Sequence, residues 1–508
     1  MHAAIIGDLT RYTGLSEEEA LQLWREKFRG VGSDRAAKML LWGKLMGESV
    51  EAYHQFNCDN HITESAYKLL QDTNAQLEKV EEMVKWGFKS QVHSACRKNF
   101  LKALADKWMR KYYTLKNVLE IKFATYNYDA CVAFMKDYPM VMKLAKRLKD
   151  DTTVSAKKKD MMKKLYKHMK DGRVLINLMA AINVLEIISD YQKWGQREKA
   201  CAFERKMAMM HLETEFASLN TKDKVVKMMK EHFEWIDFES GWMKIGQGDG
   251  DDGLKEKIAY LQSMTTHMMV RRIVKRQTEM ANQFLTAKKH LHEEEDPGFL
   301  SDLSDIFDVR LWKMTAFDVH NSIIFESEIH KMKKKLMGKT SLSFFNDLNT
   351  EEVLIEFDGV IRVIYAQMHI DDGILASARE KQHIIDQWIC LIQHCPKMDE
   401  KKFPLWIRLV KRSAASPNAQ TGTERSNSRY ALAKTKLQCR QSDEVTLARV
   451  RSQENGPPLS MFKPLPVRKL WLMNGHKYAE KVESMEKSIV LERRRADDAK
   501  NYKSKIFL

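Results

Sequence analysis

The stretch VLINLMAAINVLEII, residues 174–188, is the longest apolar run in the chain. It is too short to cross a bilayer, which takes about 20 apolar residues in a helix. Three polar residues also interrupt it, namely Asn177, Asn183 and Glu186. The run therefore predicts a helix buried in the core of a soluble protein, with no membrane partner. The opening MHAAIIGDLTRYTG lacks the basic segment of a signal peptide, so we expect an intracellular protein.

Proline usage extends the helical prediction outward from this run. Only Pro139 and Pro297 precede residue 390, and the long stretch between is rich in Met, Leu, Lys and Glu. Such a composition favours long helices, because proline costs about 3 kcal/mol in a helix interior. The segment KKDMMKKLYKHMK (158–170) is amphipathic, with one apolar face that holds Met161, Met162, Leu165 and Met169. We therefore expect a mostly helical protein.

The length of 508 residues predicts two or three domains, and two stretches predict breaks. GQGDGDDG (246–253) is an acidic connector; it lacks the glutamate that closes a calcium loop at the twelfth position, which favours a linker. HEEEDPG (292–298) is a charged run that ends in a turn.

Charge indicates the class of partner. The chain has 85 Lys and Arg against 69 Asp and Glu, a net charge of +16, and a pI near 9.2. This excess favours a polyanion, nucleic acid before a membrane surface. Basic clusters occur at 146–151, 157–173, 270–277, 331–335 and 493–495. In the cluster VRRIVKRQ the candidate nucleic-acid-binding residues are Arg271, Arg272, Lys275 and Arg276. Each cluster by itself is also compatible with a solvated helix face.

Other chemistries have less support. The chain contains neither the G-x-x-x-x-G-K-[ST] phosphate loop nor the G-x-S-x-G motif of serine hydrolases. Its seven cysteines are irregularly spaced, which suggests a reducing compartment. Two pairs, Cys58 with His61 and His93 with Cys96, could form a tetrahedral zinc site. The alternative is small buried cysteines and ordinary histidines at helix starts.

The segment FRGVGSDRAAKMLLWG (28–43) places Asp34 between a short predicted strand and a predicted helix. An aspartate in this position is commonly a helix N-cap, whose side chain accepts a backbone N–H. It could also be one carboxylate of a metal site completed by distant residues.

The C-terminal segment 416–472 resembles the end of hAT-type DNA transposases. The resemblance rests on a polar run, a Glu-Arg pair with a following serine, a basic residue, an Asn-Gly-Pro-Pro and a tryptophan. These are Glu424, Arg425, Ser426 or Ser428, Arg440, the stretch 455–458 and Trp471. With that family in view, Asp34 matches its second catalytic aspartate, Cys58 and His61 its Cys-x-x-His motif, and Lys107–Trp108 its Arg-Trp motif.

The resemblance implies a mostly α protein with a partial α/β RNase H-like core, interrupted by a large all-helical insertion domain. Residues 1–110 would be the N-terminal part of the core, 111–390 the insertion, 391–480 a core and dimerisation region, and 481–508 a basic tail. In the family two aspartates and a glutamate hold two Mg²⁺ ions for DNA cleavage and strand transfer. Asp34 and Glu424 would be two of these metal ligands.

The third carboxylate is missing from the expected place. The only aspartate before Asp34 is Asp8, in a segment that resembles the connection before the Asp34 strand. The chain is therefore expected to be an N-terminally truncated, domesticated derivative.

The leading hypothesis is a nuclear, DNA-binding protein that dimerises through its C-terminal region and lacks catalytic activity of its own. One alternative is an active transposase, or a fragment of one, with Mg²⁺ as cofactor. Another is a basic helical scaffold or RNA-binding protein, in which case the C-terminal match is a coincidence.

Overall fold

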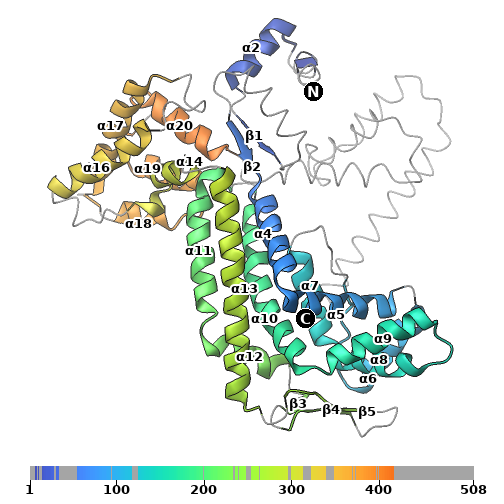
Figure 1. Ribbon diagram of the computed structural model, residues 1–508. Helices are drawn as coiled ribbons and strands as arrows, with labels where there is room; N and C mark the ends of the chain where they lie inside the picture. Colours follow the sequence, from blue (N-terminus) through green and yellow to red (C-terminus); the bar gives the residue numbers. More distant parts are fainter. Residues whose placement is uncertain are drawn as a thin grey trace, which may run out of the picture. The chain divides into compact units, whose positions relative to one another are not determined.

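The computed structural model describes much of residues 6–416, and Figure 1 shows the arrangement of its elements. The described part leaves out 8–9, 11–13, 28–29, 34–53, 93, 117–123, 198–199, 233–234, 238–239, 247–252, 262–263, 296–298, 313–321, 339–347, 369, 372, 396 and 399, together with 417–508. Asp34 and the C-terminal motif residues from Glu424 to Trp471 therefore lie outside the described residues.

The described part is mostly helical, as the sequence predicted. Ten helices and a small sheet contribute to the first of two hydrophobic cores. The helices are α4 (Asp59–Thr73), α5 (Ala75–Gln91), α6 (Ala95–Lys107), α7 (Ala124–Lys136), α8 (Tyr138–Asp150), α9 (Ala156–Met169), α10 (Gly172–Gly195), α11 (Arg205–Ser218), α12 (Lys222–His232) and α13 (Thr266–Glu295).

Helix α10 contains the run 174–188 and is buried on nearly all sides, which confirms the prediction of a core helix. It packs against α4, α5, α7 and α13, and Figure 1 shows α4, α11 and α13 running alongside it. Its polar interruptions have partners: Asn177 donates to Gln76 at 2.9 Å and Asn183 to Gln277 at 2.8 Å. Among the described residues, α10 is the one helix whose length and composition would allow it to cross a membrane, but it is largely buried inside the protein.

Helix α9 confirms the amphipathic helix expected over 158–170. Met162, Leu165 and Met169 are fully buried, Met161 is half-buried, and the lysines face outward. Asp171 then caps α10, because its side chain accepts the N–H of Arg173 at 2.9 Å.

A second hydrophobic core lies in the later part of the chain. Its elements are η1 (Ala202–Glu204), α14 (Phe299–Phe307), η2 (Val309–Leu311), α16 (Ser322–Met337), α17 (Thr350–Met368), α18 (Gly373–Arg379), α19 (Ile384–His394) and α20 (Pro404–Ala414). Three aromatic side chains meet in it: Trp406 lies 5.6 Å from Phe307 and 5.5 Å from Trp388, between ring centroids.

The N-terminal region contains α2 (Glu17–Lys27) and two short strands. Strand β1 (Gly30–Ser33) pairs in parallel with β2 (His54–Asn57), with Gly30 opposite His54. The strand expected just before Asp34 is thus present. A parallel pair requires a crossover connection, and the connecting residues 34–53 fall outside the described part.

The segment expected to be an all-helical insertion also contains a three-stranded antiparallel sheet, which corrects that expectation. Strand β4 (Trp242–Gly246) pairs with β3 (Ile236–Asp237) and with β5 (Gly253–Lys257). Gly246 lies opposite Gly253, so the glycine- and aspartate-rich stretch 246–253 joins two paired strands. Along the second half of β5, buried and exposed residues alternate, as they do in a strand with one face toward the core. Helix α13 continues to Glu295, so the acidic run 292–295 is helical.

Asp137, between α7 and α8, is a fully buried carboxyl group. It accepts a hydrogen bond from the backbone N–H of Tyr113 at 3.0 Å. Burial raises the pKa of Asp137 to about 7, although that hydrogen bond and Arg110 act in the opposite direction. The native protein therefore binds this proton more tightly than the unfolded chain, in which an aspartate has a pKa of about 3.9.

The free energy of unfolding is expected to fall as the pH rises from about 4 to about 7, because ionisation of Asp137 is favoured only in the unfolded chain. Asp137→Asn keeps an oxygen that can accept from Tyr113 but does not ionise. We expect this variant to lose that pH dependence and to gain roughly 1–3 kcal/mol above about pH 7. Urea unfolding across this pH range measures the effect, and identical pH profiles for variant and wild type would contradict it.

Candidate nucleic-acid interface

The N-terminal half of α13 presents a row of cations on its outer side. Val270, Ile273 and Gln277 are buried at helical spacing, which turns the residues between them outward. Arg271, Lys275 and Arg276 are exposed. Exposed ammonium and guanidinium groups of this kind are what contact the phosphates of a nucleic acid. We call these three residues the α13 basic row.

One acidic residue lies within this row. Glu279 accepts from Arg276 at 2.7 Å and lies 4.0 Å from Lys275. Both pairs are exposed, so each is worth well under 1 kcal/mol and yields readily to a phosphate oxygen. The α13 basic row keeps an excess of positive charge.

Arg272, the fourth candidate, turns away from the row and lies against an aromatic ring. Its guanidinium carbon is 4.7 Å from the centroid of the Tyr260 ring, and that of Arg173 is 5.6 Å away. Tyr260 remains 46% exposed in spite of both neighbours. Asp171 accepts hydrogen bonds from Arg173, among them one from Nε at 3.0 Å and one from Nη2 at 2.8 Å. We call Arg173, Tyr260 and Arg272 the Tyr260 platform.

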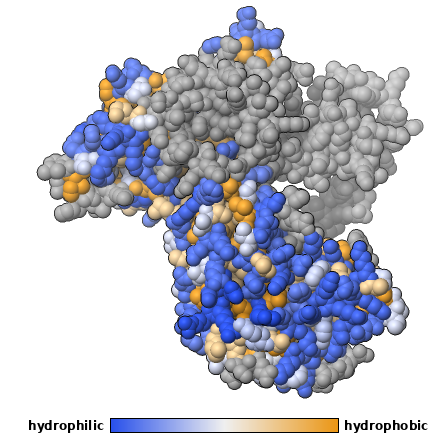
Figure 2. All heavy atoms as spheres, in the orientation of Figure 1, coloured by the Kyte–Doolittle hydropathy of each residue, from blue (hydrophilic) through white to orange (hydrophobic). Residues whose placement is uncertain are grey.

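Two lysines contact Glu256, which lies four positions before Tyr260 in the chain. Glu256 of β5 receives Lys146 at 2.7 Å and Lys170 at 3.1 Å. Burial opposes ionisation of this carboxyl, but hydrogen bonds from Lys146, Tyr166 and Lys170 hold the pKa of Glu256 below its usual value. One carboxylate thus neutralises only one of two lysines. Figure 2 shows many hydrophilic residues on the visible face of the helical bundle, with hydrophobic ones scattered among them.

A buried ionic cluster lies at the other end of α13. Lys288 is fully buried and donates to Asp59 at 2.9 Å and to Thr63 at 2.7 Å. His292 Nε2 lies 3.1 Å from the same Asp59 oxygen. The ammonium group of Lys288 also lies 4.6 Å from the centroid of the Tyr191 ring. Sequence reasoning missed this cluster, although Asp59 directly follows Cys58 in the Cys-x-x-His motif and Lys288 and His292 have the i, i+4 spacing of one helix face.

The Cys-x-x-His residues flank that aspartate. Cys58 is buried and precedes the first residue of α4, where its carbonyl oxygen accepts the N–H groups of His61 at 3.0 Å and Ile62 at 3.1 Å. His61 is half-buried on α4. Cys96 is exposed on α6, and His93 lies outside the described residues. Among the residues that are described, no three His, Cys, Asp or Glu side chains are placed to hold a metal ion.

Trp108, the predicted match to the Arg-Trp motif, follows the last residue of α6. Its side chain is 8% exposed and belongs to the first hydrophobic core. Asp34, Glu424 and Arg425 lie outside the described part, so the predicted pair of metal-binding carboxylates remains a prediction. Among the predicted nucleic-acid-binding residues, all of which the structure describes, Arg271, Lys275 and Arg276 lie together on the outer side of α13 and Arg272 turns away from them.

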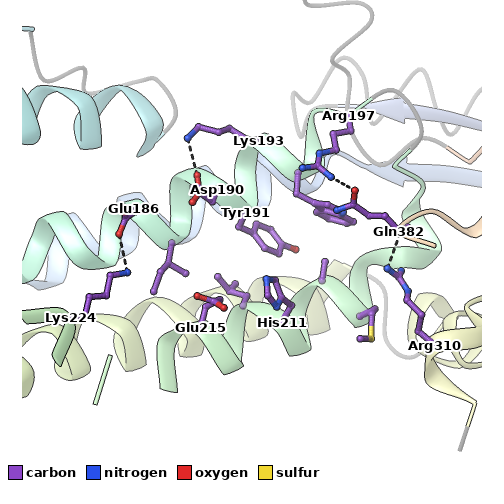
Figure 3. Close-up of a pocket in the computed structure, with 15 residues that line it drawn as sticks. Glu186, Asp190, Tyr191, Lys193, Arg197, His211, Glu215, Lys224, Arg310 and Gln382 are labelled. Carbon is purple, nitrogen blue, oxygen red and sulfur yellow. Dashed lines mark hydrogen bonds and ion pairs between the residues drawn. The ribbon is translucent and has the colours of Figure 1, made fainter. Parts of the chain in front are cut away.

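A groove of about 670 Å³ lies between α10 and α11 (Figure 3). Tyr191, Trp194 and His211 are among its lining residues, and the first two are in contact, with ring centroids 5.7 Å apart. Two ion pairs lie along it: Lys224–Glu186 joins α12 to α10 at 2.9 Å, and Lys193–Asp190 lies within α10 at 2.8 Å. Because acidic and basic side chains both line it, the groove offers a polyanion less than the α13 basic row does.

Comparisons with known proteins add no relative. No family model, no curated protein and no solved structure matches the chain.

Proposed function

We propose that this chain binds DNA and derives from an hAT-type transposase, without cutting DNA itself. The observation that carries the proposal is the exposed α13 basic row, at the position where the sequence predicted a nucleic-acid contact. Its charges are exposed to solvent, where phosphate groups can reach them, and the net charge of +16 acts in the same direction.

Two features support the transposase derivation. The parallel pair β1–β2 has Asp34 immediately after β1 in the sequence, and a long, mainly helical segment follows. This order agrees with an RNase H-like core interrupted by a helical insertion. In this proposal residues 391–480 form the dimer contact and the protein acts in the nucleus. Mg²⁺ chemistry is not part of the proposal, because Asp34 and Glu424 would be only two of three carboxylates.

The double variant Arg271→Ala with Lys275→Ala tests the DNA contact. We expect the Kd for a DNA duplex to rise about tenfold at moderate salt, because two phosphate contacts are lost. The slope of log affinity against log salt concentration should become shallower by about 1 to 2. Fluorescence anisotropy with a labelled duplex across a salt series measures both quantities.

A matched control is available on α6, where Lys98 and Lys102 are exposed and also four residues apart. Lys98→Ala with Lys102→Ala removes the same charge and should leave affinity and salt slope near the wild-type values. Equal losses in both double variants would mean that total charge, not this surface, drives binding. Wild-type affinity that does not change with salt would refute the proposal.

A further inference from the structure

We propose that the Tyr260 platform binds unpaired bases of single-stranded DNA, beside the α13 basic row that contacts phosphates. This inference rests on the proposed function and goes beyond it by assigning a strand preference. Exposed aromatic rings together with arginine side chains are the usual means of holding single strands, because every base has a face that can stack.

The backbone on both sides of Tyr260 is fixed. Gly172 donates to the carbonyl of Ala259 at 2.9 Å, and Ala259 donates to the carbonyl of Lys170 at 2.8 Å. On the other side Leu261 is fully buried against Gly172, where an added Cβ would lie 2.6 Å from the Leu261 side chain. With Ala259 bonded and Leu261 inserted into the core, the residue between them must point outward.

Tyr260 holds this position at a conformational cost. Its φ is +70°, in the left-handed region that glycine adopts without strain and that other residues seldom occupy. A glycine here would avoid that cost, and a 46% exposed ring contributes little to core packing. Strained residues of this kind concentrate at functional positions. The ring is therefore the feature that requires a function.

The two arginines make the ring suitable for a nucleic acid. Both guanidinium groups lie within 6 Å of its centroid, where cation–π attraction orients them. The Arg173 side chain is also exposed, so its guanidinium group can contact a phosphate oxygen. Asp171 also accepts hydrogen bonds from the Arg173 guanidinium group, which favours this position. In a duplex the bases are already stacked on each other and inaccessible to the ring. A single strand therefore gains a contact here that a duplex does not.

The variant Tyr260→Gly tests the inference without threatening the fold, because it relieves the left-handed strain. We expect its affinity for a labelled oligothymidine to fall about tenfold, with duplex affinity almost unchanged. Tyr260→Phe keeps the ring and should bind oligothymidine like the wild type. The matched control is Tyr126→Ala, because Tyr126 on α7 is 47% exposed and lies away from the platform in the sequence.

The possible outcomes separate this inference from the proposed function. Unchanged oligothymidine binding in Tyr260→Gly, or equal losses for single strand and duplex, would overturn the strand preference. Duplex binding that still depends on Arg271 and Lys275 would leave the DNA-binding proposal intact in that case. If the wild type binds neither DNA form, both proposals fail together.

Discussion

Replacing Asp59 by alanine is expected to lower the free energy of unfolding by about 3–5 kcal/mol. The variant leaves the ammonium group of Lys288 buried without its carboxylate, and both side chains of this pair are inaccessible to solvent in the wild type. Thr63 would be the remaining hydrogen-bond partner named above, and a hydroxyl does not offset a buried charge. Urea unfolding followed by circular dichroism measures the loss.

The ion pair between Asp59 and Lys288 also predicts that the free energy of unfolding depends on pH under acidic conditions. Burial works against ionisation of Asp59, but the charge of Lys288 and the contact with His292 hold the pKa of this carboxyl well below its usual value. A depressed native pKa means that the stabilisation is present above the unfolded pKa of about 3.9 and is lost as the pH falls below it. In Asp59→Ala the free energy of unfolding should therefore lack the decrease that this ion pair causes in the wild type at acidic pH.

A double variant serves as the control. Asp59→Leu with Lys288→Met removes both charges and fills much of the space, and replacing a buried ion pair in this way is often neutral or stabilising. We expect the double variant to be more stable than either single variant. A cost below about 1 kcal/mol for Asp59→Ala, or a double variant as unstable as the sum of both singles, would contradict this account.

This cluster illustrates what the sequence could not reveal. Asp59 and Lys288 are 229 positions apart, and no local pattern links an aspartate at a helix start to one lysine among many. The helices were predictable, because periodic burial of apolar residues and the scarcity of proline act locally, as in 158–170. The sheet β3–β5 was missed because the glycine- and aspartate-rich stretch 246–253 was interpreted as a linker between domains.

The candidate interface was predictable only in part. The basic residues of α13 were identified from their clustering, but the different orientation of Arg272 depends on where the chain brings Tyr260. Nothing in the local sequence predicts that Tyr260 is exposed. Its exposure follows from the hydrogen bonds of Ala259 to Lys170 and Gly172 and from the burial of Leu261. Contacts between segments so far apart in the sequence can be recognised only once the fold is known.

The second large effect is expected in the second hydrophobic core, where Trp406→Ala should cost about 3–5 kcal/mol. Trp406 is fully buried and its ring lies 4.8 Å from that of Phe357, in addition to Phe307 and Trp388. Removing the indole leaves a cavity lined by large rigid rings that cannot collapse into it. Because the α13 basic row belongs to the first core, DNA affinity should persist under conditions where the variant remains folded.

Two phenylalanine variants separate cavity formation from hydrogen bonding. The Trp388 indole N–H donates to the carbonyl of Phe307 at 2.8 Å, whereas that of Trp406 is buried without a hydrogen-bond partner among the described residues. Trp388→Phe should therefore cost about 1 kcal/mol more than Trp406→Phe, because it leaves a buried carbonyl unpaired. Thermal unfolding of all three variants gives the ranking, with Trp406→Ala least stable and Trp406→Phe most stable. If Trp406→Phe proved as unstable as Trp406→Ala, packing of the ring would not be what Trp406 contributes.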